Sequence, residues 1–133
     1  MPFVVDASII AAWALGEPDD RVTEIRARLQ NDNALAPSLW WYEVRNALIQ
    51  NERRQRLTES DTAAFLTGLS ELGITLDHSP DEATVIGLSR RHRLTAYDAA
   101  YLELAMREGL PLATLDRELI QAARAENVSL VGQ

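Results

Sequence analysis

The sequence contains no cysteine, and its basic residues include no lysine. Without cysteine the chain can form neither disulfides nor thiolate metal sites, which suits a reducing compartment such as the cytoplasm. No apolar run approaches the ~18 residues of a membrane-spanning helix. No basic segment precedes the first apolar run, so a signal peptide is not expected. The chain also lacks a glycine-rich phosphate loop and the Gly-x-Ser-x-Gly turn of many hydrolases.

Acidic residues outnumber basic ones, and the net charge is −7 at pH 7. This charge argues against general electrostatic binding to nucleic acid. The use of arginine alone reflects either a GC-rich genome or a need for side chains that pair with phosphate through two hydrogen bonds. Six arginines form two clusters near predicted helix ends, where cations also favour the helix dipole. They are Arg53, Arg54 and Arg56, followed by Arg90, Arg91 and Arg93.

Short apolar runs alternate with helical segments, a pattern that predicts a parallel sheet covered by helices. The length of 133 residues and the 47% hydrophobic content fit one α/β domain, residues 1–133, with a single core. Strands are expected at Phe3–Val5, Ala34–Ala36, Ile74–Leu76, Leu112–Thr114 and Ser129–Val131. Helices are expected near residues 7–15, 20–31, 38–54, 59–72, 80–91, 95–108 and 117–126.

Polar side chains directly follow two of the predicted strands. Asp6 and Ser8 come after the first strand, and Thr114 and Asp116 come at the end of the fourth. Ligands of an open parallel sheet bind outside the carboxyl ends of its strands, where the strand order reverses. Both acids also precede helices, where an N-cap contributes ~1 kcal/mol. A capping carboxylate can still bind a cation with its other oxygen, so the two interpretations are compatible.

Asp98 lies in the first turn of a predicted helix, in the segment "LTAYDAAYLELA". Thr95-x-x-Asp98 fits a capping box, in which the acid reaches back to the backbone N–H of the cap residue. The same spacing occurs twice more, at Thr58-x-x-Asp61 and Ser79-x-x-Glu82. Spacing alone therefore favours a helix cap for Asp98.

Glu43 lies in the middle of a predicted helix, where it cannot act as a cap. A carboxylate among aromatic and aliphatic neighbours is costly to bury unless it is paired or bound to a cation. Glu43 is thus either an acid at the edge of the apolar stripe, paired with Arg45 or Arg54, or part of a cation site. Other acids, such as Glu103 and Glu108, are expected on solvated helix faces.

Four segments carry most of the distinctive motifs of the chain: "FVVDASIIAAWAL", "APSLWWYEVRNAL", "LTAYDAAYLELA" and "LPLATLDREL". Taken in this order and spacing, they resemble the PIN-domain nucleases, and most closely the VapC-like toxins of bacterial toxin–antitoxin pairs. The resemblance covers nearly the whole chain. It implies a PIN-like three-layer α/β/α sandwich with a central five-stranded parallel sheet, in which the acids of these segments converge at one end.

The resemblance also implies roles for individual residues. The acids carried over by motif are Asp6, Glu43, Asp98 and Asp116, as metal ligands and catalytic groups, with Thr114 in the hydroxyl position before the last acid. Ser8 is expected to support an acid or contact substrate, and Asn46 to support Glu43. Carboxylates without nitrogen or sulfur ligands favour Mg²⁺ or Mn²⁺, which lower the pKa of bound water and stabilise charge on a phosphodiester.

The hypothesis that follows is a Mg²⁺- or Mn²⁺-dependent endoribonuclease toxin acting on single-stranded or loop RNA. Its products would carry a 5′-phosphate and a 3′-hydroxyl. The family also implies a homodimer and a cognate VapB-like antitoxin that blocks the site. The apolar residues considered for these contacts are Trp40, Trp41, Phe65 and Leu69.

Two alternatives belong to other functional classes. A phosphoacceptor domain of the receiver type has a similar length and acids at strand ends, but it uses an adjacent acidic pair and a lysine that this chain lacks. Haloacid-dehalogenase-like phosphatases fail for the same reasons. A catalytically inactive PIN-like binding module is the remaining alternative, and the intact set of four acids argues against it.

Overall fold

The computed structural model describes all 133 residues. Its strands are β1 (Phe3–Val5), β2 (Ala34–Pro37), β3 (Ile74–Asp77) and β4 (Leu112–Ala113). Its helices are α1 (Ala7–Ala14), α2 (Asp20–Leu29), α3 (Leu39–Arg53), α4 (Glu59–Ser70), α5 (Glu82–His92), α6 (Ala96–Glu108) and α7 (Arg117–Ala125). None of these helices combines the length and the apolar character needed to cross a bilayer.

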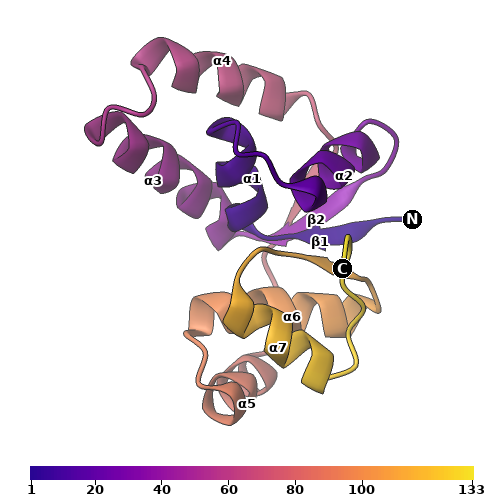
Figure 1. Cartoon of the computed structure of the whole chain (residues 1–133). Coiled ribbons are helices and arrows are strands. Elements are labelled where there is room, and N and C mark those ends of the chain that lie inside the picture. Colours follow the sequence, from indigo (N-terminus) through magenta and orange to yellow (C-terminus); the bar gives the residue numbers. More distant parts are fainter.

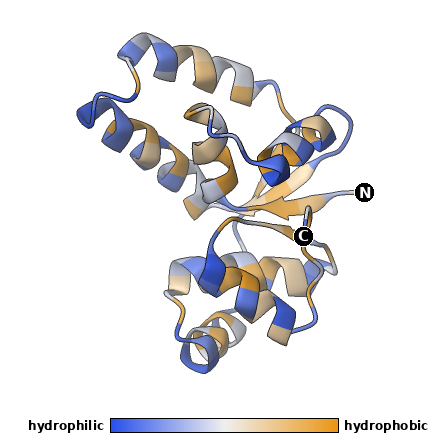
Figure 2. Cartoon of the chain, viewed as in Figure 1, coloured by the Kyte–Doolittle hydropathy of each residue, from blue (hydrophilic) through white to orange (hydrophobic).

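Helices cover both faces of the sheet, as Figure 1 shows. The layer above the sheet in that view holds α1 to α4, and the layer below holds α5 to α7. The predicted three-layer α/β/α arrangement is therefore confirmed. Figure 2 shows the apolar strands enclosed between these layers, with hydrophilic residues at the outer ends of α3 and α4.

All strand pairs are parallel, and the strand order is β3-β2-β1-β4. The chain first adds strands on one side of β1 and then returns to place β4 on the other side. The boundary between β1 and β4 is therefore the point where the strand order reverses, which is where an open parallel sheet offers a ligand site.

The predicted fifth strand is wrong in extent, because Ser129–Val131 contributes only a single bridge, between Leu130 and Leu112. Two backbone hydrogen bonds hold it: the Leu112 N–H donates to Ser129 O at 2.9 Å, and the Val131 N–H donates to Leu112 O at 3.0 Å. Left-handed backbone at Asn127 (φ 60°) and Gly132 (φ 76°) turns the chain on either side of this bridge. The sheet thus has four strands.

The core is built around β1 and α6. The three residues of β1 are completely buried, as expected for a central parallel strand that is covered on both faces. Along α6, every residue from Ala99 to Ala105 is buried. This helix packs against α5, α7 and the sheet, so it has no broad solvent-facing side at its centre.

The burial of α6 corrects the expectation for Glu103, which is only 2% exposed. Arg107 donates to both of its carboxylate oxygens, at 2.7 and 3.1 Å. The same guanidinium donates to both oxygens of Asp77 at the end of β3, at 2.7 and 3.2 Å. Glu103 is therefore a paired core carboxylate that ties α6 to the sheet.

Capping at the helix starts agrees with the sequence patterns in part. The capping box of Thr58 and Asp61 forms completely. The one predicted at Ser79 is wrong, because Asp81 is the N-cap of α5. Its carboxylate accepts hydrogen bonds from both the backbone N–H and the hydroxyl of Thr84, at 3.1 and 2.6 Å. The Asp81 carboxylate thus accepts two hydrogen bonds at the start of α5, whereas the Ser79 hydroxyl accepts none.

Candidate active site

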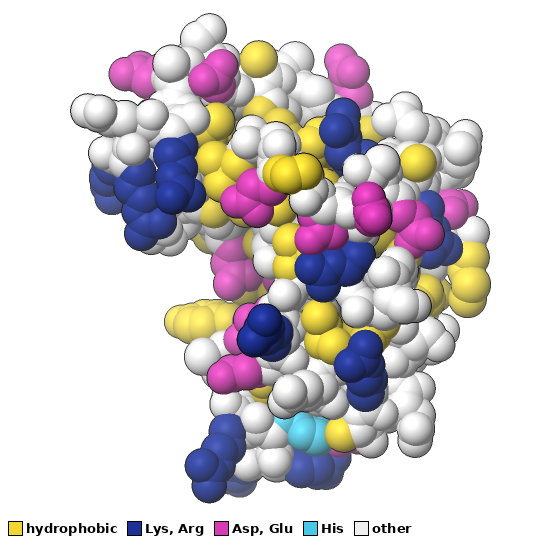
Figure 3. All heavy atoms as spheres, in the orientation of Figure 1, with side chains coloured by type: hydrophobic (Ala, Val, Ile, Leu, Met, Phe, Trp, Pro, Cys, Tyr) yellow, Lys and Arg dark blue, Asp and Glu magenta, His cyan; other side chains and the backbone are white.

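The four acids singled out by motif converge on one cavity of about 300 Å³. They arrive from four places in the fold: the end of β1, the middle of α3, the first turn of α6 and the start of α7. The lining residues are Asp6, Ala7, Ser8, Ala11, Glu43, Asn46, Ala47, Gln50, Asp98 and Asp116. In Figure 3 acidic side chains gather at the indented left edge of the molecule, between the two helix layers.

Asp6 occupies the N-cap position of α1 but makes no capping hydrogen bond. Its Oδ2 instead accepts hydrogen bonds from the hydroxyls of Ser8, at 2.8 Å, and Thr114, at 2.6 Å. These hydroxyls accept in turn from the backbone N–H groups of Leu115 and Asp116, both at 3.0 Å. This hydroxyl bracket fixes Asp6 and leaves its Oδ1 without a partner in the protein.

The environment of Asp6 opposes its negative charge. The residue is 6% exposed, and burial raises its pKa from 3.8 to about 6, although the two hydroxyls act in the opposite direction. The charges of Glu43 and Asp98 raise the pKa further. No arginine forms an ion pair with any of these three acids. The cavity therefore concentrates negative charge that the protein itself does not neutralise.

Glu43 is held by a residue that no sequence motif identified, Tyr101. Tyr101, in α6, is completely buried and donates its hydroxyl to Glu43 Oε1 at 2.5 Å. Burial raises the pKa of Glu43, the Tyr101 hydrogen bond lowers it, and the charge of Asp98 raises it. The alternative ion pair with Arg45 or Arg54 is wrong. Arg45 instead stacks 4.1 Å from the ring centroid of Trp41 and donates to its carbonyl.

Asp98 and Asp116 both line the cavity, but only Asp116 also caps its own helix with its side chain. Thr95 caps α6 by accepting from the Asp98 N–H at 3.1 Å, but Asp98 returns no hydrogen bond to the Thr95 backbone, so only half a capping box forms. The pKa of Asp98 is raised by burial, then by the charge of Asp116. Asp116 is a true N-cap, since Oδ1 accepts from the Leu119 N–H at 3.1 Å, and it still lines the cavity.

Asn46 lines the cavity and is solvent-exposed, but it makes no hydrogen bond to Glu43. The expected support of Glu43 thus comes from Tyr101. Spacing offered one signal for this: Tyr101 lies three residues after Asp98 on the same face of α6. What spacing could not show is that its hydroxyl faces α3.

The donor set suits a hard divalent cation. Every ionisable group in the cavity is a carboxylate, and none is neutralised by a protein cation. No three of the chain's Asp, Glu and His side chains lie close enough to surround one ion. Mg²⁺ usually keeps several waters and binds proteins through one or two carboxylates. The arrangement therefore fits a largely hydrated ion that one or two of these acids would bind directly, with the remaining acids binding its waters.

Comparison with known proteins agrees with this architecture. Residues 3–125 match the PIN domain family, so the chain belongs to the PIN-domain family. This membership excludes the receiver-type alternative. One relative, "Ribonuclease VapC3" of Pyrobaculum aerophilum, is 39% identical over 124 residues, which is 91% of this chain and 94% of that protein. A protein with the same name from Mycobacterium tuberculosis is 36% identical over 119 residues, with 90% and 85% covered.

Two solved structures show the same fold. PAE2754 from Pyrobaculum aerophilum superposes with a TM-score of 0.72 at 26% identity, covering 92% of this chain and 84% of that one. VapBC2 from Rickettsia felis, crystallised with a DNA fragment from its promoter, superposes with a TM-score of 0.67 at 17% identity, covering 98% and 97%.

The raised pKa of Asp6 predicts how stability depends on pH. Between pH 3.8 and about 6, Asp6 stays protonated in the folded chain but loses its proton in the unfolded chain. The free energy of unfolding therefore falls as the pH rises through this window. Above it, the buried charge costs about 3 kcal/mol. Asp6→Asn should therefore be more stable than wild type at pH 7 without divalent cations, and the difference should vanish near pH 4. Urea unfolding in a chelating buffer measures this.

Two controls accompany this measurement. Asp61→Asn should destabilise the protein at pH 7, because its capping hydrogen bonds lower the pKa of that acid. Addition of Mg²⁺ should stabilise wild type but not Asp6→Asn, since a ligand of the folded state stabilises by mass action. Equal stability of wild type and Asp6→Asn at pH 7 would contradict the buried charge.

The hydrogen bond between Tyr101 and Glu43 makes a second prediction. Tyr101→Phe keeps the packed ring but removes the donor, so the pKa of Glu43 should rise. Carboxyl carbon NMR titration measures this pKa directly. The matched control is Tyr97→Phe, because Tyr97 is 64% exposed and its hydroxyl makes no hydrogen bond. A Glu43 pKa unchanged by Tyr101→Phe would refute the contact.

Proposed function

We propose that this protein is a metal-dependent endoribonuclease that hydrolyses phosphodiester bonds of single-stranded or loop RNA, and that it acts in the cytoplasm as the toxin of a toxin–antitoxin pair. The observation that carries the proposal is the convergence of four unneutralised carboxylates at the point where strand order reverses. The names of the relatives at 39% and 36% identity support RNA as the substrate.

The residues that would hold Mg²⁺ or Mn²⁺ are Asp6, Glu43, Asp98 and Asp116. When bound, the ion supplies a water of lowered pKa and neutralises charge on the phosphodiester. The hydroxyl bracket occupies only Oδ2 of Asp6, and Tyr101 occupies only Oε1 of Glu43, so each acid keeps one free oxygen.

Water is the proposed nucleophile, because the only hydroxyl that lines the cavity is already engaged. The Ser8 hydroxyl donates to Asp6 and accepts from the Leu115 N–H. Attack by water on phosphorus with departure of the 3′-oxygen leaves a 5′-phosphate and a 3′-hydroxyl.

The test of this function is RNA cleavage by purified protein with Mg²⁺ or Mn²⁺. Asp6→Asn and Asp98→Asn should each lower the rate by at least about a hundredfold, because each removes a charge from the site that binds the metal and the developing phosphate charge. Asp20→Asn, an exposed acid in α2, is the matched control and should cleave like wild type. Equal cleavage by wild type and both site variants would contradict the assignment.

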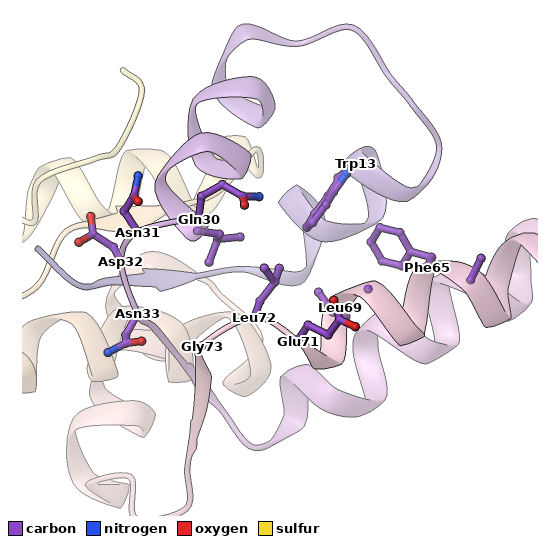
Figure 4. Close-up of a pocket in the computed structure, with 13 residues that line it drawn as sticks. Trp13, Gln30, Asn31, Asp32, Asn33, Phe65, Leu69, Glu71, Leu72 and Gly73 are labelled. Atoms are coloured by element: carbon purple, nitrogen blue, oxygen red, sulfur yellow. The ribbon is translucent and has the colours of Figure 1, made fainter.

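A separate cavity is the proposed docking site for the antitoxin. It measures about 570 Å³ and lies between α1, α2 and α4, with none of the four site acids in its lining. Figure 4 shows Trp13 of α1 beside Phe65 of α4 at one end of it. Their rings meet edge to face at 5.2 Å. Leu69 lies at its base but is only 5% exposed.

The proposed docking site predicts that a substitution in this cavity abolishes inhibition by the antitoxin but leaves RNA cleavage intact. The candidate partner is a small protein with a DNA-binding fold and a disordered tail, encoded by the neighbouring open reading frame. Wild type mixed with it should lose RNA cleavage. Phe65→Glu should cleave RNA alone and should keep cleaving in the mixture, because a charge in the apolar lining opposes docking. Phe65→Leu is the control that should remain inhibited. Full inhibition of Phe65→Glu would contradict this docking site.

We also propose a homodimer formed through exposed apolar side chains. Trp40 is 4% exposed and belongs to the core, so it is unavailable for such a contact. Trp41, Tyr42 and Ile49 of α3 are exposed, as are Ile86 of α5 and Tyr97 of α6. A second copy of the chain would remove these side chains from water.

A further inference from the structure

The arginines differ in whether the protein provides them with a partner. Arg21, Arg91 and Arg107 form ion pairs with acids, and Arg26, Arg28 and Arg45 stack over aromatic rings. The arginines at the end of α3 have neither kind of partner, and all three are exposed: Arg53, Arg54 and Arg56. Figure 3 shows a group of basic side chains at this end of α3, on the left.

This cluster continues a polar stripe that begins in the active-site cavity. Glu43, Asn46 and Gln50 line the cavity from α3 at positions i, i+3 and i+7. The next position on that face is i+11, which is Arg54, the C-cap residue of the helix. At 1.5 Å per residue, Arg54 lies about 16 Å along the helix from Glu43. One face of α3 thus leads from a carboxylate through two amides to a cation.

The chemistry of the stripe suits a single RNA strand. The two amides carry donors and acceptors for base edges and 2′-hydroxyls, and guanidinium groups bind phosphate through paired hydrogen bonds. A protein of net charge −7 needs a local cationic surface to hold a polyanion near an acidic cavity. The dipole at the end of α3 does not account for all three arginines, because Arg56 lies beyond the helix and the effect fades within the last turn.

We propose that the part of this stripe beyond Glu43, formed by Asn46, Gln50 and Arg54 with Arg53 and Arg56 at its end, is the track that binds the RNA strand on one side of the scissile phosphate. The inference rests on the proposed ribonuclease function and adds the path of the substrate. In this proposal the three arginines bind phosphates outside the cavity, and the four acids act only at the phosphodiester bond that is cut.

The experiment measures RNA binding without cleavage. In the Asp6→Asn background and without divalent cations, the affinity for a labelled oligouridylate about twelve nucleotides long is measured across salt concentrations. Loss of three phosphate contacts should reduce the slope of log K against log salt by about 2, and the R53Q/R54Q/R56Q variant should bind roughly tenfold more weakly at low salt. R53K/R54K/R56K should keep most of the slope.

Control variants test whether weaker RNA binding results from loss of the track or from loss of positive charge anywhere on the surface. R90Q/R124Q removes two exposed, unpaired arginines from α5 and α7 and should leave the slope unchanged. Circular dichroism checks that each variant is folded. If the triple glutamine variant does not fold, Arg54→Gln alone should reduce the slope by about 0.7.

The outcomes distinguish this inference from the function on which it rests. An unchanged slope in R53Q/R54Q/R56Q overturns the track, and so does an equal loss in R90Q/R124Q. If wild type cleaves RNA in those cases, the nuclease proposal still stands. Failure of wild type to cleave any RNA overturns the proposed function, and with it the assignment of this surface to a substrate strand. A reduced slope supports the track when the same arginine substitutions, made in the wild-type background with Mg²⁺, also raise KM for RNA cleavage without lowering kcat.

Discussion

The interaction on which the site depends is the hydroxyl bracket around Asp6. Two side-chain hydroxyls hold one oxygen of a buried carboxylate, and one of them comes from a residue 108 positions away in the sequence. The bracket forms because β1 and β4 are adjacent, with the Asp6 N–H donating to Ala113 O at 2.9 Å. It holds a charged group at the centre of the fold, where desolvation opposes that charge.

Helix α6 connects the other acids to this centre. One turn of the helix brings Asp98 to the cavity and Tyr101 to Glu43, so a single buried element positions groups from two segments of the chain. Capping and site roles are compatible within the same residues. Asp116 caps α7 with one oxygen while it lines the cavity, whereas Asp98 leaves the capping to Thr95.

Charge is distributed unevenly over the molecule. Several arginines are already engaged by acids or aromatic rings, and the strongest example is Arg107, which bridges Glu103 and Asp77 far along α6 from the site. The acids of the cavity have no such partner, although the chain has thirteen basic residues. This separation leaves one region anionic and suited to cations. It leaves another, at the end of α3, cationic and suited to phosphate.

The sequence by itself determined the α/β class, the approximate positions of the helices and of four strands, and, through its resemblance to a family, the four acids of the site. These features are encoded in apolar periodicity and in short motifs, where the interacting residues lie within a few positions of each other. Only the tertiary structure decided that Ser129–Val131 forms a single bridge, that Glu103 is buried, and that Tyr101 rather than Asn46 holds Glu43. Each of these depends on which elements pack together. Tyr101 lies 58 residues from Glu43 and Thr114 lies 108 residues from Asp6, and no local pattern specifies a contact over such distances.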